Sequence, residues 1–196
     1  MITAAVILAA GGSARLGRPK QQLLYKGKTL LENAVQAAID SVCRPIIVVL
    51  NTGSSNLIPA IAGAEVYIIQ NENWQEGIGT SIQCGIKELQ KISPPVTDAV
   101  IMLCDQPYAD SGLLNELIKK RIESGKEIIA SEYNNTLGVP ALYNHTFFPL
   151  LQQLKGKEGA KKIILSNDTS VASVPFPLGD VDIDTHEDYE HLINLE

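Results

Sequence analysis

The fold of this chain is decided by residues 8–20, Leu-Ala-Ala-Gly-Gly-Ser-Ala-Arg-Leu-Gly-Arg-Pro-Lys. The apolar run from Ala4 to Ala9 predicts a buried strand, which stops at two glycines and a serine before any helical pattern resumes. Paired glycines let the backbone approach a ligand closely, so that consecutive N–H groups can converge on a phosphate. Arg15 and Lys20 add two cations that suit phosphate oxygens. The stretch therefore predicts a strand followed by an anion-binding loop.

Two better-known phosphate loops do not fit this stretch. The spacing from Gly12 to Gly17 is that of a Walker loop, but Arg18-Pro19 stands where that loop needs Lys-Ser or Lys-Thr. A dinucleotide fingerprint needs Gly-x-Gly-x-x-Gly, whereas the glycines here are residues 11, 12 and 17. A glycine-rich turn with solvated Arg15 and Lys20 remains the purely structural alternative.

Composition predicts one globular domain over residues 1–196, because 45% of the residues are hydrophobic and the mean hydropathy is +0.06. A net charge of −6, with no basic patch beyond residues 15–20, argues against a nucleic-acid partner. We see no signal-peptide pattern and no apolar run of membrane-spanning length, and so expect a cytoplasmic protein without a membrane partner. The three widely spaced cysteines are expected to be reduced and mostly buried.

Apolar periodicity alternates between strands and helices along the chain, which is the pattern of an α/β fold. The expected strands are residues 4–9, 45–50, 66–69, 99–103, 128–131 and 171–174. The expected helices are residues 29–41, from about 80 to 92, 111–124, 145–154 and 159–165, and a terminal helix that Thr185 and Asp188 would cap. The lysines of residues 155–162 are read as a solvated face rather than a phosphate clamp.

Three further segments place polar groups where a ligand could meet them. Residues 71–82 contain the one tryptophan and open a helix, with Thr80 or Ser81 placed to cap it. Asp105 follows a buried strand, so its carboxylate should lie on the ligand side of a parallel sheet. Near the C-terminus, strand alternation would put Asp182 and Asp184 on one face, where they repel unless a cation lies between them or they point into water. The structural alternatives are Trp74 as core filling and Asp105 as a turn cap.

These segments resemble, in the same order, the motifs of the MobA-like nucleotidyltransferases, and most of all the molybdenum cofactor cytidylyltransferases. The resemblance implies a three-layer α/β/α domain with a mostly parallel sheet, in the GT-A-like, Rossmann-like architecture of nucleotide-diphospho-sugar transferases. It also implies Mg²⁺-dependent transfer of CMP from CTP to molybdopterin with release of pyrophosphate. GTP or another nucleoside triphosphate is the alternative donor, and a molybdenum hydroxylase apoenzyme is a candidate partner.

The resemblance assigns roles to residues that match the family's motifs. Arg15, Lys20 and Asp105 are expected to be catalytic, and Asp105 with Asp184 to hold the metal, with Asp182 as a weaker candidate. The nucleotide is expected to bind at Leu8, Ala9, Ala10, Gly11, Gly12, Ser13, Gly79, Thr80 and Ser81.

The chain departs from the family's motifs in the segment that related enzymes carry for the acceptor substrate. Related molybdopterin enzymes often carry Arg-Gly-His-Pro where this chain has Leu137-Gly138-Val139-Pro140. Another phosphorylated acceptor, such as a phosphosugar or a cofactor precursor, is therefore the first alternative. A metal-dependent glycosyltransferase and a non-catalytic carrier of nucleotide or cofactor for molybdenum hydroxylase maturation are the others. Asp182-Ile183-Asp184 favours the glycosyltransferase, but that class carries its Asp-x-Asp mid-chain.

Overall fold

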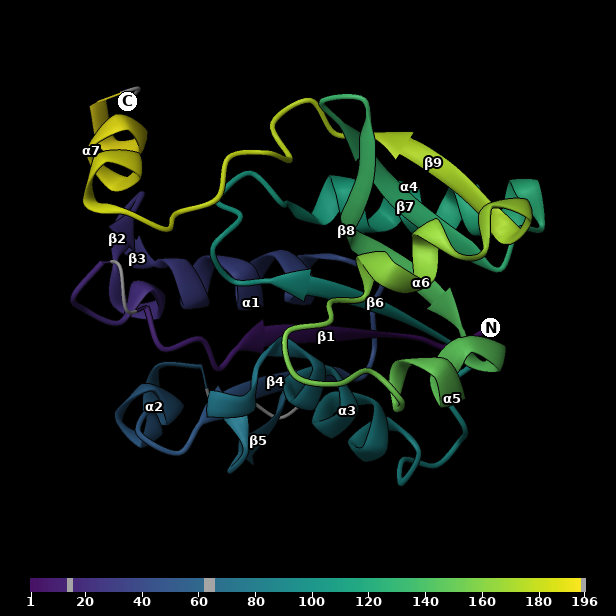
Figure 1. Ribbon diagram of the computed structural model, residues 1–196, viewed down its shortest axis with the longest axis horizontal. Coiled ribbons are helices and arrows are strands. Elements are labelled where there is room, and N and C mark those ends of the chain that lie inside the picture. The colour runs from purple at the N-terminus through teal and green to yellow at the C-terminus, as the bar shows by residue number, and fades with distance from the viewer. Residues whose placement is uncertain (14–15, 62–65, 195–196) are drawn as a thin grey trace.

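The computed structural model describes residues 1–13, 16–61 and 66–194, and within them seven strands form one sheet (Figure 1). The strand order is β5-β4-β1-β6-β8-β7-β9, and in the described chain β8 alone runs antiparallel to the others. The strands are β1 Thr3–Ala9, β4 Ile46–Asn51, β5 Val66–Asn71, β6 Asp98–Leu103, β7 Ile128–Tyr133, β8 Thr136–Asn144 and β9 Val171–Pro175. A separate two-stranded ribbon pairs β2 Leu24–Tyr25 with β3 Lys28–Thr29.

Helices cover both faces of the sheet, which gives the three-layer α/β/α fold expected from the sequence (Figure 1). The α-helices are α1 Leu30–Asp40, α2 Ile58–Ile61, α3 Ile78–Leu89, α4 Ser111–Ser124, α5 Phe148–Leu151, α6 Lys161–Leu165 and α7 His186–Asn194. Short 3₁₀ turns are η1 Lys20–Gln22, η2 Ser55–Leu57, η3 Trp74–Glu76, η4 His145–Phe147 and η5 Asp168–Ser170. No helix in the described ranges is long and apolar enough to cross a membrane.

Strand β1 lies at the centre of the sheet and is buried on both faces. Alternate residues point to opposite sides, so Ile7 packs with the α1 and α4 layer while Val6 packs with the α3, α5 and α6 layer. The continuous apolar sequence of β1 is what a strand buried between two helical layers requires. All three cysteines are free, with Cys43 and Cys104 buried and Cys84 half-buried, as expected.

The start of α3 differs from the prediction. The helix begins at Ile78, so Thr80 and Ser81 lie in its first turn and Gly77 is the cap. Gly77 adopts a φ of +128°, which side-chain-bearing residues rarely take. The Gly79 N–H donates a hydrogen bond of 3.0 Å to the carbonyl of Gly156. A loop distant in the chain therefore accepts from a helix N-terminal N–H that a capping side chain would otherwise bind.

The second half of the chain also departs from the predicted elements. Residues 145–154 form a 3₁₀ turn and the single turn of α5 instead of one helix, and α6 is shorter than predicted. Strand β8 was not predicted, and its pairing with β6 and β7 makes it a strand. Residues 181–184 are not a strand, because Ile183 leaves the sheet to pack under α7, where it is fully buried.

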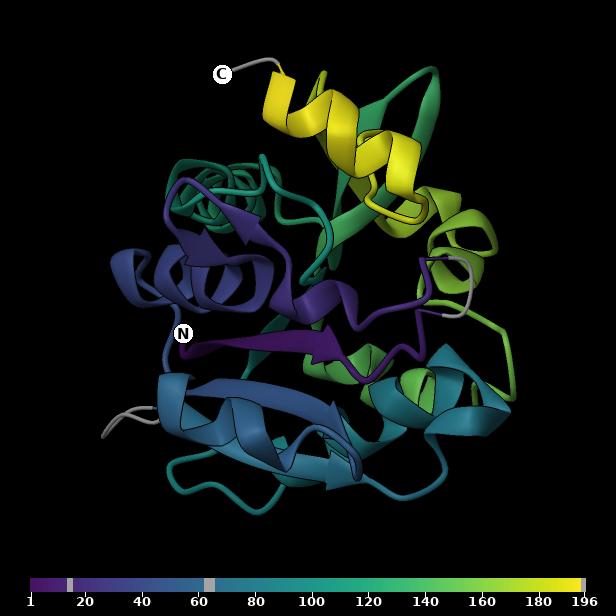
Figure 2. The same ribbon diagram turned by 90° about the vertical axis from the view of Figure 1, so that its left-hand side faces the viewer.

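The carboxyl ends of the parallel strands meet at one edge of the molecule, which Figure 2 views face on. Strands β1 and β6 are neighbours, with Leu8 paired to Leu103, so the glycine loop after β1 and Asp105 after β6 emerge side by side. The C-terminal segment returns to this edge, where the Ile183 N–H donates a hydrogen bond of 3.1 Å to the carbonyl of Asp105. Parallel sheets bind ligands at this edge.

Candidate active site

A cavity of about 600 Å³ lies at the carboxyl edge of the sheet. Its walls are residues 8–12, Lys20 and Gln21 on one side, Trp74, Ile78 and Ser81 on another, and residues 103–105 with Asp182 and Asp184 on the third. Most of the sequence-predicted site residues therefore meet in one place. Ser13, Gly79 and Thr80 are not part of the wall, and Arg15 lies outside the described residues.

The glycine loop is held by a side chain that sequence reasoning did not single out. The buried Gln21 donates from Nε2 to the carbonyl of Ala9 at 2.7 Å and to that of Gly11 at 3.2 Å. Ser13 accepts a hydrogen bond from the Lys20 backbone at 2.9 Å through its Oγ. These bonds tie residues 9–13 to the start of η1 without using a ligand. The sequence feature that could have identified Gln21 is its position directly after Lys20 of the motif.

Lys20 brings the two predicted metal-binding aspartates together. Its Nζ forms an ion pair with Asp105 Oδ2 and donates to Asp184 Oδ1 at 3.1 Å. Burial disfavours the ammonium, but the negative charge of Asp105 and the hydrogen bonds to Asp105 and Asp184 together outweigh that cost, so the pKa of Lys20 is raised above its usual value. Lys20 therefore stays charged at neutral pH, between two carboxylates that are 85 and 164 residues away in the chain.

The aspartates fit a divalent cation that also takes ligands from a substrate. Asp105 is 6% exposed, and its second oxygen, Oδ1, has no hydrogen-bond partner among the described residues. Mg²⁺ is commonly bound by one or two protein carboxylates together with phosphate oxygens and water. No group of three His, Cys, Asp or Glu side chains in the described ranges is arranged as a metal cage. The donor set fits a cation that binds together with a phosphate ligand.

Asp182 is a third carboxylate on the same cavity wall. Loss of hydration in the cavity, with the negative charges of Asp105 and Asp184, raises the pKa of Asp182 to about 6. The close set of carboxylates is built by the irregular path of residues 180–184 and not by the strand alternation that the sequence suggested.

The loop before α3 contributes both to the core and to the cavity. Trp74 packs against the α3 layer and lines the cavity beside Gly12. A Cβ atom at Gly12 would come within 2.7 Å of the indole, so the second glycine of the motif makes room for the tryptophan. The two alternatives for Trp74, core filling and ligand contact, are thus not exclusive. Ser81 is the one predicted nucleotide-binding residue of α3 that reaches the cavity.

Lys157 also lines the cavity, although its sequence context suggested a solvated face. Its loop packs on the start of α3, where the Gly156 carbonyl accepts from Gly79 and the Leu154 carbonyl accepts from the Gln83 side chain. Local periodicity gives no indication of this contact, because the two segments are far apart in the chain. The cavity therefore has a second cation in addition to Lys20.

Leu137 and Val139 stand where related molybdopterin enzymes often carry arginine and histidine, and neither residue lines the cavity. Leu137 and Val139 are partly buried against the apolar core of the α3 layer. The buried Gln106 donates from Nε2 to the carbonyls of Val139 and Gly179, at 3.1 Å each, and so ties β8 to the C-terminal segment. Asp105 is not the cap of α4, because Asp110 accepts the Leu113 N–H at 2.9 Å in that role.

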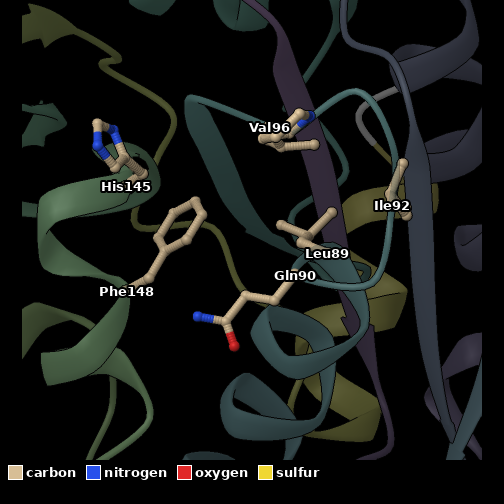
Figure 3. A pocket seen from close by; sticks show the side chains of 7 residues that line it. Leu89, Gln90, Ile92, Val96, His145 and Phe148 are labelled. Carbon is tan, nitrogen blue, oxygen red and sulfur yellow. The ribbon is translucent and has the colours of Figure 1, made fainter.

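A second cavity, of about 280 Å³, lies at the opposite end of the sheet (Figure 3). The Phe148 ring points toward Leu89 and Val96 across its opening, while the His145 imidazole points away from them (Figure 3). Its wall has no carboxylate and no lysine within the described residues. It offers apolar surface and not the charges that bind phosphate.

Comparison with known proteins finds relatives and solved structures that match nearly the whole chain. The purine catabolism protein PucB of Bacillus subtilis (strain 168) is 28% identical over 197 residues, which cover 94% of this chain and 93% of PucB. Nicotine blue oxidoreductase of Paenarthrobacter nicotinovorans is 35% identical over 104 residues, which cover 52% of this chain and 48% of that protein. The crystal structure of Rv0371c from Mycobacterium tuberculosis H37Rv superposes with a TM-score of 0.81 at 29% identity, covering 99% of this chain and 98% of Rv0371c.

A structure of Rv0371c in complex with manganese is also similar, with a TM-score of 0.73 at 27% identity and 99% of each chain covered. The family model of the MobA-like NTP transferase domain matches residues 5–171. That match includes the glycine loop, the Trp74 loop and Asp105, and it ends before Asp182 and Asp184. This chain belongs to the family of MobA-like NTP transferase domains.

Proposed function

We propose that this protein is a divalent-cation-dependent cytidylyltransferase that moves CMP from CTP to a molybdopterin-type phosphate and releases pyrophosphate. The observation that carries the proposal is the convergence of Lys20, Asp105 and Asp184 beside the glycine loop in one cavity. The manganese complex of Rv0371c supports a divalent metal. Mg²⁺ as the metal, CTP as the donor, a molybdenum hydroxylase partner and a cytoplasmic location stay predictions from the sequence.

The reaction forms one bond and breaks one bond at the α-phosphorus of the nucleotide. An oxygen of the acceptor phosphate attacks, and the bond to the oxygen that bridges the α- and β-phosphates breaks, so pyrophosphate leaves with that electron pair. The acceptor phosphate is already anionic, so no general base is required. A divalent cation held by Asp105 and Asp184 would offset negative charge on the reacting phosphates.

The chain's own residues would position the reactants. The backbone of Gly11 and Gly12 lines the cavity, and Gln21, in the same wall, holds the loop through its bonds to the carbonyls of Ala9 and Gly11. Lys20 would turn from the aspartates to the triphosphate when the cation binds, and Arg15 is proposed to act beside it. Holding charged reactants in line, with charge stabilised in place, accounts for most of the catalysis in such reactions.

The first experiment measures pyrophosphate release with Mg²⁺ and molybdopterin, with CTP, GTP and ATP compared. We expect release with CTP that requires the acceptor. In the Asp105→Ala variant we expect a fall of about a thousandfold, because several kcal/mol of charge stabilisation are removed. Nucleotide binding without release from any of the three nucleotides would refute the molybdopterin assignment and direct the search to other phosphorylated acceptors.

A second candidate function is reduction of a substrate at the expense of a nicotinamide cofactor. It is favoured by the partial match to nicotine blue oxidoreductase. The glycines at positions 11, 12 and 17 do not form a dinucleotide fingerprint, which counts against it. Oxidation of NADH or NADPH that the protein accelerates, with no pyrophosphate release, would favour this function over transfer.

A further inference from the structure

We infer that Asn71 is a positioning residue that aims the hydroxyl hydrogen of Ser81 at a hydrogen-bond acceptor on the nucleotide base. The inference rests on the proposed binding of a nucleoside triphosphate, but not on the identity of the acceptor substrate. Asn71 is the last residue of β5, and Ser81 lies in the first turn of α3; both are 5% exposed.

The orientation of the Asn71 amide follows from its partners. The backbone N–H of Asn73, which can only donate, lies 3.0 Å from Asn71 Oδ1. The other end of the amide is therefore Nδ2, and its two hydrogens go to Thr80 Oγ1 at 2.8 Å and to Ser81 Oγ at 3.0 Å. Both hydroxyl oxygens thus accept from Asn71, and each must send its own hydrogen elsewhere.

The two hydroxyls differ in where that hydrogen can go. Thr80 Oγ1 has the carbonyls of Gly77 and Asn73 at 2.9 and 3.0 Å, so its hydrogen is used inside the protein. For Ser81 Oγ, the described residues supply no acceptor. Ser81 lines the cavity and Thr80 does not. A buried hydroxyl with an unused hydrogen at a cavity wall is expected to donate to a ligand.

The neighbouring walls indicate which part of a nucleotide meets Ser81. Leu8 and Ala10 pack in the apolar core of the α3 layer and Ile78 opens α3, whereas Lys20 and Asp105 follow β1 and β6. Lys157, whose loop packs on the start of α3, is the charged residue on the α3 side of the wall. The base is the flat, uncharged part of a nucleoside triphosphate and suits the apolar side. A carbonyl oxygen or a ring nitrogen without hydrogen on the base would accept from Ser81, and cytosine offers both.

The test compares binding of a nucleoside triphosphate with binding of inorganic tripolyphosphate, which lacks the base. Isothermal titration calorimetry is run with Mg²⁺ present and no acceptor, on Asn71→Ala and Asn71→Asp. The aspartate keeps the shape of the side chain, but it accepts the Ser81 hydrogen and so turns it away from the cavity. We expect both variants to bind the nucleotide about 3- to 10-fold more weakly, because one neutral hydrogen bond is lost. Their affinity for tripolyphosphate should be unchanged.

Two further variants separate positioning from a structural effect. In a Ser81→Ala background, the Asn71→Ala change should cause no additional loss, because the two act through one hydrogen bond. Asn73→Ala is the matched control: the same residue type two positions away, exposed and without a side-chain cap bond. It should bind both ligands like the wild type.

Three results would overturn the inference. These are an equal loss for tripolyphosphate, a further loss in the Ser81→Ala background, and a wild-type protein that binds no nucleotide more tightly than tripolyphosphate. Failure of the proposed transfer to molybdopterin is distinguishable from these results, because it would leave the binding constants unchanged.

Discussion

Two cavities of this molecule lie at opposite ends of the same helix and differ in what their walls carry. The start of α3 borders the carboxyl-edge cavity through Ile78 and Ser81, and its end borders the other cavity through Leu89. The first wall has three carboxylates and two lysines, whereas the second is mostly apolar. Loops after parallel strands can present charges to a ligand, and the opposite end of this sheet is closed by packing. The candidate site is therefore distinguished by the charges on its wall as well as by its larger volume.

After Asp105→Ala, the largest effect is expected from Lys20→Met. Turnover should fall by about a hundredfold, because a cation that stabilises the triphosphate in the reaction is lost. Binding of Mn²⁺ to the nucleotide-free protein should strengthen by roughly tenfold, because the ammonium no longer competes for Asp105 and Asp184. Electron paramagnetic resonance titration of Mn²⁺ measures this second effect.

The control for Lys20→Met is Lys91→Met, which removes an exposed lysine paired with Glu88. It should change neither quantity. Metal affinity that falls in Lys20→Met would contradict the placement of the ammonium at the cation position.

A smaller effect is expected from Lys157→Ala. The KM for the nucleotide should rise by roughly tenfold with little change in kcat, because a charged hydrogen bond to a phosphate is lost at the cavity wall. Steady-state kinetics measures both constants. Lys155→Ala, two residues earlier in the same loop and not on the cavity wall, is the matched control. Identical constants for the two variants would show that the charge of Lys157 does not reach the ligand.

The smallest effect on turnover is expected at the apolar cavity. Leu89→Ala removes a side chain that is 1% exposed and should lower the free energy of unfolding by about 2–5 kcal/mol. Activity per folded molecule should stay within about twofold of the wild type, because Leu89 lies at the far end of α3 from Ser81. Urea denaturation and kinetics well below the transition measure the two effects. A large loss of turnover in the folded variant would mean that the two ends of α3 are coupled.

The sequence predicted most of the first half of the fold, since its signals there are local. The apolar run of residues 4–9 forms the buried strand β1, and the helix expected over residues 29–41 is present as α1. In the second half the signals are weaker. Strand β8 contains Gly138 and Pro140, which obscure a strand pattern, and residues 181–184 alternate like a strand without forming one. Pairing with β6 and burial of Ile183 decided these two segments.

For the candidate site, the sequence by itself determined which residue types follow the central strands and which family the chain belongs to. Lys20, Asp105 and Asp184 were named from the motifs alone, and their roles stay predictions. Only the tertiary structure decided that Lys20 lies between the two aspartates, that Lys157 reaches the cavity and that Asn71 leaves a hydrogen of Ser81 unused. Each depends on contacts between segments distant in the chain or on the direction of one hydrogen bond, and neither is encoded in local periodicity.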